Sequence, residues 1–392
     1  MPLSRPFRAL PGALASAATI ALALTGCIPK AGADSEAINV TLNDSACTVS
    51  ANTTASGPVT FQVTNAGADV NEFEILAKDR VRIAGEKENI GPGTTVNYVV
   101  QLSEGSYFTA CKPGMTGSPR HFAPFTVTKG GAASGSVNQN TEIAGAAARY
   151  LTYVRDQSDR LLAATKAFAA AYEAGDTASA QAQYPAARSF YERIEPTAEQ
   201  FGDVDPALDL READVEPGQA WTGWHRIEKD LWTPAGYTPL DASGRSRLAA
   251  QLLADTQRLH DLVHASGFTL TVDQISNGAI GLMEEVSRTK ITGEEETFSH
   301  TDLWDFQANV DGAQEAYRTV RDIAVAKGAA GAQVVRRLDA EFTAIDALLA
   351  RYRSGDGFVP HTVLSTAQVK ELSDEVNALS EPLSRLTSII VG

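Results

Sequence analysis

Cysteine and basic residues are both scarce in this sequence. Three cysteines among 392 residues are too few to hold a fold together mainly by disulfides. Lysine and arginine number 33 against 48 aspartates and glutamates, which gives a net charge of −15 with histidine neutral. An acidic surface repels the phosphates of DNA and RNA, so we expect no nucleic-acid partner and regard cations as the more natural ligands.

Long hydrophobic runs are missing beyond the N-terminal region. The marked apolar run there, residues 13–24, follows Arg5 and Arg8 and has the length of a secretory signal rather than of a membrane-spanning helix. No later segment approaches the ~18 uninterrupted apolar residues that would span a bilayer. We therefore predict that residues 1–26 are a signal peptide and that the mature chain works outside the cytoplasm.

The apolar run ends in a sequence typical of lipid attachment. Leu24-Thr25-Gly26-Cys27 is similar to a bacterial lipobox, in which the chain is cut before the cysteine and the thiol carries diacylglycerol. We predict a lipoprotein signal peptide, lipidation of Cys27, and attachment to the periplasmic or cell-surface side of the cell membrane. An ordinary secretory signal is the alternative. Since residues 1–26 carry two arginines and no acidic residue, the mature chain has a net charge of −17.

Residues 35–129 have the pattern of an all-β domain. Short runs of β-branched and aromatic residues, such as Ile38–Leu42 and Val59–Val63, are separated by Gly-Pro and Pro-Gly pairs. From Thr95 to Leu102, apolar residues at even positions alternate with mostly polar residues at odd positions, which is the period of a half-buried strand. We predict an antiparallel β-sandwich.

The rest of the chain has helical periodicity. Residues 130–140 begin with a Gly/Ser/Ala-rich stretch typical of a flexible linker, and residues 141–392 are rich in alanine and leucine. The clearest apolar stripe steps by three and four residues through Val369, Leu372, Val376, Leu379, Leu383, Leu386 and Ile390. Pro382 lies within this stripe and predicts a kink or a break. Seven or eight such helices are most simply arranged as an up-and-down bundle.

A candidate metal-binding pair lies in one of these predicted helices. In Gly223-Trp224-His225-Arg226-Ile227-Glu228, His225 and Glu228 are three residues apart and share one helix face, so an imidazole nitrogen and a carboxylate can bind the same ion. A simple His–Glu contact is the alternative. The zinc-peptidase motif His-Glu-x-x-His is absent, because Arg226 follows the histidine and Lys229 stands in place of the second one.

Other residues of the bundle can complete such a site. A helical core lined by carboxylates and one histidine is a common way to hold metal ions. The candidate carboxylates are Glu192, Glu195, Asp241, Glu284 and Glu285. We expect the run Glu294–Glu296 to be a charge cluster at a loop or helix end. His260 and His264, four residues apart, are expected to belong to an ordinary amphipathic helix.

Several of these segments resemble one known family. Four segments of the bundle region and three of the β region, in order, are similar to the EfeO family: Tyr191–Pro196, His225–Lys229, Gly281–Val286 and Lys290–Asn309, and Asn71–Leu76, Glu86–Gly93 and Gly105–Cys111. The resemblance covers essentially the whole mature chain. It implies an N-terminal all-β cupredoxin-like sandwich and a C-terminal all-α imelysin-type helical bundle. It also implies an iron site that includes His225 and Glu228. As further ligands, which the resemblance does not assign, we prefer Asp241 and Glu285.

The same resemblance implies a role in iron uptake. EfeO proteins are the extracytoplasmic component of the EfeUOB ferrous-iron uptake system, so the expected partners are an EfeU-type iron permease and an EfeB-type haem peroxidase. The expected cargo is iron, as Fe²⁺ or Fe³⁺, with copper and zinc as alternatives. A secreted imelysin-type metallopeptidase is the competing hypothesis, and it requires a metal-bound water, a general base and a substrate cleft. A polyanion-binding or alginate-binding protein is a third, which the acidic charge opposes unless a cation bridges.

The β domain does not have the ligands of a blue-copper site. Such a site needs two histidines and a cysteine, usually with a methionine, whereas His121 is the only histidine of this domain and none lies between Cys111 and Met115. The resemblance instead implies a metal site formed by Cys47, Glu72 and Cys111. A disulfide between the two cysteines in an oxidising compartment is an equal alternative, because it would consume both thiolates.

Overall fold

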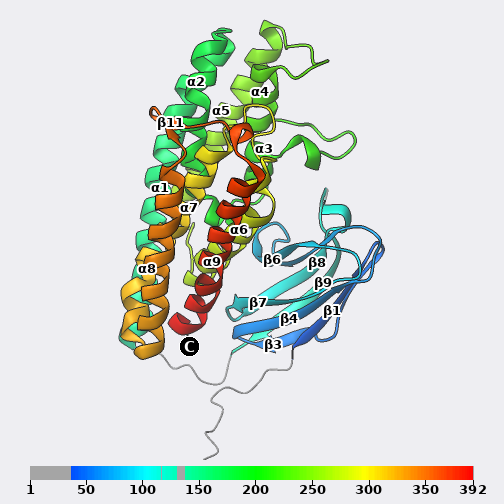
Figure 1. Ribbon diagram of the computed structural model, residues 1–392. Helices are drawn as coiled ribbons and strands as arrows, with labels where there is room; N and C mark the ends of the chain where they lie inside the picture. The colour runs from blue at the N-terminus through cyan, green and yellow to red at the C-terminus, as the bar shows by residue number, and fades with distance from the viewer. Residues whose placement is uncertain (1–36, 116, 130–136, 392) are drawn as a thin grey trace, which may run out of the picture. The chain divides into compact units, whose positions relative to one another are not determined.

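The structure is a computed structural model that describes residues 37–115, 117–129 and 137–391. β-Strands make up the N-terminal part of the chain and α-helices nearly all of the C-terminal part (Figure 1). The predicted signal peptide, the predicted lipidation site Cys27 and residues 130–136 of the predicted linker lie outside the described residues. Of the helices that are described, none is long and apolar enough to cross a membrane.

Two sheets form the N-terminal domain, with strand orders β2-β1-β4-β7 and β3-β9-β8-β5-β6. The strands are β1 (Ile38–Asn43), β2 (Ala46–Val49), β3 (Thr53–Ala55), β4 (Gly57–Asn65), β5 (Asn71–Leu76), β6 (Ile83–Ile90), β7 (Thr95–Leu102), β8 (Gly105–Cys111) and β9 (Arg120–Thr128). Most neighbours are antiparallel, as predicted, but β1 pairs with β4 and β3 pairs with β9 in parallel. Parallel neighbours need a long connection, which the intervening strands supply in both cases.

The core of the sandwich is aromatic. Phe61 of β4 packs against Phe73 of β5 and Phe125 of β9, with ring centroids 5.2 and 5.7 Å apart, and all three rings are buried. The alternation predicted for β7 is observed, because Val100 and Leu102 are buried in the same core. Since successive side chains of a strand point to opposite faces, the neighbours of these core residues point to the outer face of their sheet.

Nine α-helices form the described part of the C-terminal domain, residues 137–391, together with short 3₁₀ turns and a hairpin of β10 (Arg353–Ser354) and β11 (Gly357–Phe358). The helices are α1 (Val137–Glu173), α2 (Thr177–Glu192), α3 (Val204–Asp209), α4 (Gly223–Trp232), α5 (Ala242–His264), α6 (Val272–Arg288), α7 (Asp302–Ala326), α8 (Ala329–Ala350) and α9 (Thr366–Val391). Helix α1 packs along α2 and α5, and α9 packs along α6 and α8 (Figure 1). The predicted helical bundle is confirmed.

Two details of the helices differ from the prediction. Helix α1 begins at Val137, so the last four residues of the predicted linker are helical, and the Gly/Ser/Ala-rich stretch stops just before them. Helix α9 continues through Pro382, so of the predicted kink or break the break does not occur. Leu379 and Leu383 lie on either side of the proline and are buried, and the packing of this stripe outweighs the roughly 3 kcal/mol that a proline costs inside a helix.

Candidate metal centre

The glycine of the Gly-x-His-x-x-Glu segment determines how closely α4 approaches α3. Gly223 begins α4 with φ +85°, and a β-carbon there would lie 2.1 Å from the backbone oxygen of Leu208. Only glycine permits both this backbone conformation and this approach. As a result His225, near the start of α4, lies beside Asp209, the last residue of α3, with 3.3 Å between Nε2 of the histidine and Oδ1 of the aspartate.

His225 and Glu228 lie on one buried face of α4, as their spacing predicts. Nδ1 of His225 is 3.4 Å from Oε2 of Glu228. The other carboxylate oxygen of Glu228 accepts hydrogen bonds from the backbone N–H groups of Phe298, at 2.8 Å, and Ser299, at 2.6 Å. Glu228 therefore holds the loop between α6 and α7 against α4.

That loop carries two further carboxylates to the same histidine. Oε1 of Glu295 lies 3.6 Å from Nε2 of His225, and Oε1 of Glu296 lies 3.9 Å from Nδ1. The run Glu294–Glu296 is in a loop, as expected, but Glu295 and Glu296 are buried. Two groups of potential ligands therefore share the histidine, one on each ring nitrogen: Asp209, His225 and Glu295, and His225, Glu228 and Glu296.

A buried arginine lies among these carboxylates. The side chain of Arg188, on α2, is fully buried, and its guanidinium forms ion pairs with five carboxylates, those of Glu192, Asp209, Glu295, Glu296 and Asp305. Buried carboxylates are unfavourable unless a positive charge and hydrogen bonds compensate them. Arg188 therefore supplies part of the positive charge that allows this cluster to be buried without a metal ion.

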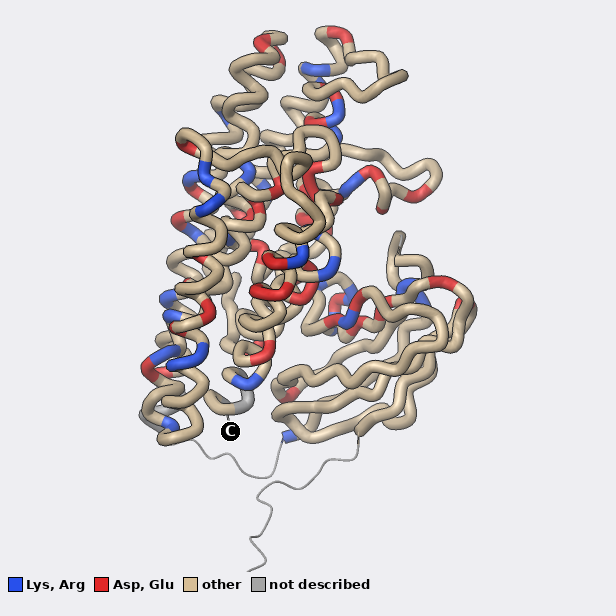
Figure 2. Tube along the Cα trace, viewed as in Figure 1, with Lys and Arg blue, Asp and Glu red and all other residues tan. Residues whose placement is uncertain are grey.

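Lys290 compensates a neighbouring pair of carboxylates. Its Nζ lies 2.5 Å from Glu195 and 3.4 Å from Glu192. Asn309 donates hydrogen bonds to the same two glutamates, at 2.6 and 2.9 Å. Figure 2 shows how acidic and basic positions are interleaved along the helices. Glu192 and Glu195, which the sequence offered as metal ligands, are therefore already bound by fixed side chains.

The charges around His225 determine its protonation state. Burial and the guanidinium of Arg188 lower the pKa of His225, but the carboxylates of Asp209, Glu228 and Glu295 outweigh them and raise that pKa well above its ordinary value. The metal-free centre therefore contains an imidazolium among carboxylates. Because a metal ion binds the unprotonated nitrogen, its binding at His225 must displace a ring proton.

An open cavity reaches one side of the centre. Its wall includes Asp209, Arg211, Glu285 and Glu295. Asp209 and Glu295 of this wall lie beside Nε2 of His225, at 3.3 and 3.6 Å, and this buried nitrogen makes no well-directed hydrogen bond to any residue that the structure describes. The cavity therefore reaches two of the carboxylates around His225, those of Asp209 and Glu295, and its wall carries basic as well as acidic side chains.

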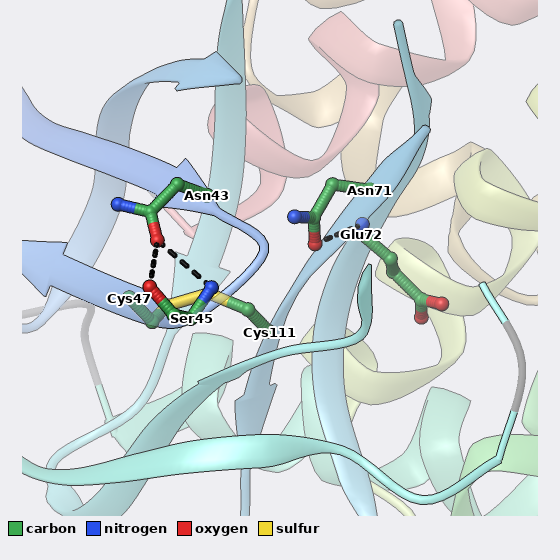
Figure 3. Close-up of a disulfide and its surroundings, with 6 residues drawn as sticks. All are labelled: Asn43, Ser45, Cys47, Asn71, Glu72 and Cys111. Atoms are coloured by element: carbon green, nitrogen blue, oxygen red, sulfur yellow. Dashed lines mark hydrogen bonds between the residues drawn. A yellow bond between two sulfur atoms is a disulfide. The ribbon is translucent and has the colours of Figure 1, made fainter. Parts of the chain in front are cut away.

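The two cysteines of the sandwich are joined to each other. Cys47 of β2 and Cys111 of β8 form a disulfide with their Cα atoms 5.9 Å apart (Figure 3). Of the two alternatives that the sequence leaves open, the structure has the disulfide. In this form neither sulphur is a thiolate, so the proposed ligand set of Cys47, Glu72 and Cys111 is wrong for the disulfide-bonded protein.

Glu72 belongs to a different cluster on the outer face of the sheet. Its neighbour Phe73 is paired with Cys111 and points into the core, so the side chain of Glu72 points away from the disulfide, as Figure 3 shows. Glu72 forms a group of potential ligands with Glu74 and Glu86. Burial and the neighbouring Glu72 raise the pKa of Glu74 and of Glu86 well above the ordinary value.

Comparison with known proteins places both domains. Family models match a cupredoxin-like domain at residues 16–120 and an imelysin domain at residues 146–386. The chain is 36% identical over 361 residues to the iron uptake system component EfeO of Yersinia pestis, across 91% of this chain and 92% of that protein. It is 35% identical over 363 residues to the protein of the same name from Escherichia coli (strain K12), with the same coverage. This chain belongs to the EfeO family.

Membership of the EfeO family confirms the predicted architecture, a cupredoxin-like sandwich followed by an imelysin bundle. The two residues preferred as further ligands, Glu285 and Asp241, lie in different parts of the bundle. Glu285 of α6 lines the cavity beside the centre. Asp241 is exposed and caps the start of α5, where its Oδ1 accepts a hydrogen bond from the backbone N–H of Gly244 at 2.7 Å. Asp241 belongs to neither group of ligands around His225.

Sequence reasoning missed the residues that come from other elements. Asp209, Glu295 and Glu296 surround His225, and Arg188 lies between them. Glu295 and Glu296 fall inside the segment Lys290–Asn309 that carries the EfeO resemblance, so its polar run was an available signal. Neither periodicity nor spacing singles out Asp209 or Arg188, because their role depends on the contact between α2, α3 and α4.

The chemistry of the centre suits iron as a cargo. One imidazole and several carboxylates form a mixed nitrogen and oxygen donor set, which suits both oxidation states of iron better than a set of thiolates would. The donors come from α3, α4 and the loop before α7, so they are held by three separate elements. The arrangement therefore brings potential cation ligands together in a buried position, with two of them on the wall of an open cavity.

Proposed function

We propose that this chain is the lipid-anchored, extracytoplasmic iron-binding component of an EfeUOB-type ferrous-iron uptake system. The observation that carries the proposal is the buried His225 with Asp209 and Glu295 at one ring nitrogen and Glu228 and Glu296 at the other. It occurs in a family whose relatives are named as iron uptake system components.

Capture begins at the open side of the centre. A ferrous or ferric ion enters along Glu285 and Glu295, displaces the proton of His225 and takes the imidazole nitrogen with the carboxylates of Asp209 and Glu295. The guanidinium of Arg188 contacts the same two carboxylates. Ion and guanidinium therefore compete for them, which weakens binding enough for the iron to be released to the next component.

The proposed anchoring rests on the lipobox-like sequence at Cys27, and the proposed partners rest on the family resemblance. A diacylglycerol on Cys27 would keep the protein at the outer side of the cell membrane, close to an EfeU-type permease that takes the iron and an EfeB-type haem peroxidase. In the sandwich, Glu72 would bind metal with Glu74 and Glu86 in place of the cysteines. This set of oxygens favours hard ions such as Fe³⁺ over copper or zinc.

Iron titration of matched variants tests the assignment of the centre. Iron is added to the purified protein and to the His225→Gln and Glu285→Gln variants, with binding measured by calorimetry under anaerobic conditions for Fe²⁺. Loss of a residue that only supports a metal ligand usually lowers metal affinity by roughly 10- to 100-fold. We expect His225→Gln to lose at least that much affinity for iron. Glu285→Gln, which changes a cavity residue outside the ligand groups, should have a smaller effect. Equal affinity in all three proteins would contradict the proposed centre.

The competing peptidase hypothesis receives less support from the geometry. In a peptidase, Glu228 would have to act as the general base. One of its carboxylate oxygens, however, already accepts two backbone hydrogen bonds. Lys229 stands where a second histidine would complete the zinc-peptidase motif. Metal-dependent cleavage of a protein substrate that disappears in Glu228→Gln would favour the peptidase over the iron carrier.

A further inference from the structure

A second group of potential metal ligands lies on the surface of the bundle, in the paired helices α1 and α5. Asp159 of α1 and His260 and His264 of α5 place their ligand atoms within 4.8 Å of one another. We propose that these three residues form a surface site for a borderline divalent ion of the first transition series, with Cu²⁺ and Zn²⁺ bound most strongly. The proposal is independent of the function assigned to the centre at His225.

The three ligand atoms already converge on one point. Nε2 of His260 is 2.9 Å from Oδ1 of Asp159, and Nε2 of His264 is 3.5 Å from the same oxygen. Donors on a tetrahedral zinc ion with bonds of about 2.0–2.1 Å lie roughly 3.3 Å apart. Small movements of these side chains therefore suffice to admit an ion.

The second nitrogen of each imidazole has a partner that orients the ring. Nδ1 of His264 is 2.9 Å from the backbone oxygen of His260, which can only accept, so Nδ1 carries the proton and Nε2 keeps its lone pair. Nδ1 of His260 is 3.3 Å from the carboxylate of Asp261 and 3.4 Å from the amide nitrogen of Gln257. Nε2 of His260 donates to the carboxylate of Asp159, so a bound ion would take the place of that proton. A hydrogen bond from the other ring nitrogen to a carboxylate or a carbonyl is the usual support of a metal-bound histidine.

The backbone holds the ligands in place, and solvent reaches them. His260 and His264 are one turn apart on the same face of α5, and their rings stack with centroids 4.2 Å apart. The residues before them, Leu259 and Val263, anchor the adjacent face of the helix in the core. The exposed fractions of the side chains are 24% for His260, 33% for His264 and 59% for Asp159. Water can therefore fill the remaining coordination positions.

Nearby basic residues do not occupy the place of the ion. Arg155 donates to the backbone oxygen of Val263 at 2.8 Å, and Arg160 pairs with Asp156 at 2.9 Å. Both cations are thus bound elsewhere, and the partners of Asp159 are the two imidazoles. Its carboxylate remains free to bind a metal when the imidazoles are unprotonated.

Electron paramagnetic resonance of bound Cu²⁺ distinguishes this site from the centre at His225. One equivalent of Cu²⁺ is added to the untagged full chain at neutral pH. The surface site supplies two imidazole nitrogens, whereas the other centre supplies one, so we expect nitrogen hyperfine splitting from two equivalent rings. In His264→Gln the splitting should fall to one nitrogen, and the affinity for Zn²⁺ should fall by at least about tenfold. Asp159→Asn should also weaken Zn²⁺ binding.

His121→Asn provides the matched control. His121 is exposed on β9 and has φ +59°, a conformation that asparagine tolerates, so the spectrum and the affinity should be unchanged. Circular dichroism of each variant confirms that the helices remain folded. Identical spectra and identical Zn²⁺ affinities in the unaltered protein and in His260→Gln/His264→Gln would overturn the proposal.

Discussion

At the residue scale, the guanidinium of Arg188 and the imidazolium of His225 carry the positive charge inside the metal-free centre. Both are buried, and both lie within ion-pair distance of Asp209 and Glu295. The two cations differ in chemistry, because an arginine keeps its proton at any physiological pH whereas an imidazolium can release it. Arg188 is therefore a permanent counter-ion, whereas His225 is the residue that would give up its proton to a metal ion.

Removal of the charge of Arg188 should destabilise the protein. In Arg188→Met the side chain keeps its length, but five carboxylates lose their shared partner. We expect the free energy of unfolding to fall by about 3–5 kcal/mol, the usual effect of leaving buried charge unpaired, and added iron to restore part of the loss. Urea unfolding with and without iron measures both quantities. Arg188→Lys keeps the positive charge, so its unfolding free energy should fall less. An unchanged unfolding free energy in Arg188→Met would contradict the role assigned to Arg188.

The affinity for iron should rise with pH. Because its neighbours raise the pKa of His225 well above the ordinary value, the ring is protonated at neutral pH, and each bound ion must release that proton. For the folding of the metal-free protein the sign is opposite. The raised pKa contributes stability that is complete below the unfolded pKa of about 6.5 and is lost as pH rises through the folded value.

Calorimetry in two buffers with different ionisation enthalpies counts the released protons. The observed heat of iron binding should differ between the buffers for the unaltered protein, and the difference should shrink in His225→Gln by the equivalent of one proton. If the two buffers gave the same heat with the unaltered protein, iron binding would release no proton, and His225 would not be an imidazolium that is deprotonated by the metal.

At the element scale, one glycine determines the position of the start of α4, and one disulfide links β2 to β8. Gly223 allows α4 to approach the backbone of Leu208, and the disulfide of Cys47 and Cys111 joins strands of the two sheets. The sequence indicated both positions, since the glycine belongs to the motif and the cysteines formed one of two alternatives. The sequence did not indicate that α3 lies against α4, because a contact between two separate helices produces no periodic pattern in the sequence.

Substitution of Gly223 should disturb the metal centre more than substitution of a comparable glycine. Gly223→Ala combines an unfavourable φ of +85° with a clash against Leu208, whereas Gly218 has φ +88° and open space around its Cα. The conformational cost of about 1–2 kcal/mol is common to both. We expect iron affinity to fall in Gly223→Ala and to remain unchanged in Gly218→Ala, as measured by titration. Equal affinities would show that the closeness of α3 and α4 does not matter.

The disulfide should stabilise the sandwich without contributing to iron binding in the bundle. Since it closes a loop between residues 64 positions apart, we expect Cys47→Ala/Cys111→Ala to lose about 2–5 kcal/mol of unfolding free energy and to bind iron at His225 normally. Denaturant unfolding and iron titration measure the two effects. Titration of the unfolded, unreduced protein with a thiol reagent should find no free thiol from this pair; two reactive thiols would instead support thiolate ligation.

At the scale of the whole molecule, composition and patterning were sufficient for the architecture. A period of two with Gly-Pro punctuation predicted the sandwich, and an apolar stripe through Leu372 and Leu379 predicted helices, because burial of one face follows directly from such periods. The site was predicted only in part. His225 and Glu228 share one helix, whereas Asp209 and Glu295 reach it through the tertiary fold. Asp241 was placed in the site by its type alone, and its side chain is used to cap α5.

The location of the molecule in the cell can be tested through Cys27. If the thiol carries diacylglycerol, the unaltered protein should fractionate with membranes, and Cys27→Ser should be recovered in the soluble extracytoplasmic fraction or retain its signal peptide. Mass spectrometry of the mature N-terminus identifies the lipid. Soluble behaviour of the unaltered protein would favour the ordinary secretory signal.

The ion pairs of Arg188 and Lys290 have a consequence for the working cycle of the molecule. Proteins whose metal site consists of uncompensated ligands unfold when the metal leaves, so each turnover requires refolding. Here the carboxylates of the empty centre already contact cations of the protein, Arg188 and Lys290, and the surrounding helices share a large apolar core. If the centre binds iron as proposed, the protein would therefore remain folded when the ion leaves and would bind a new ion without refolding.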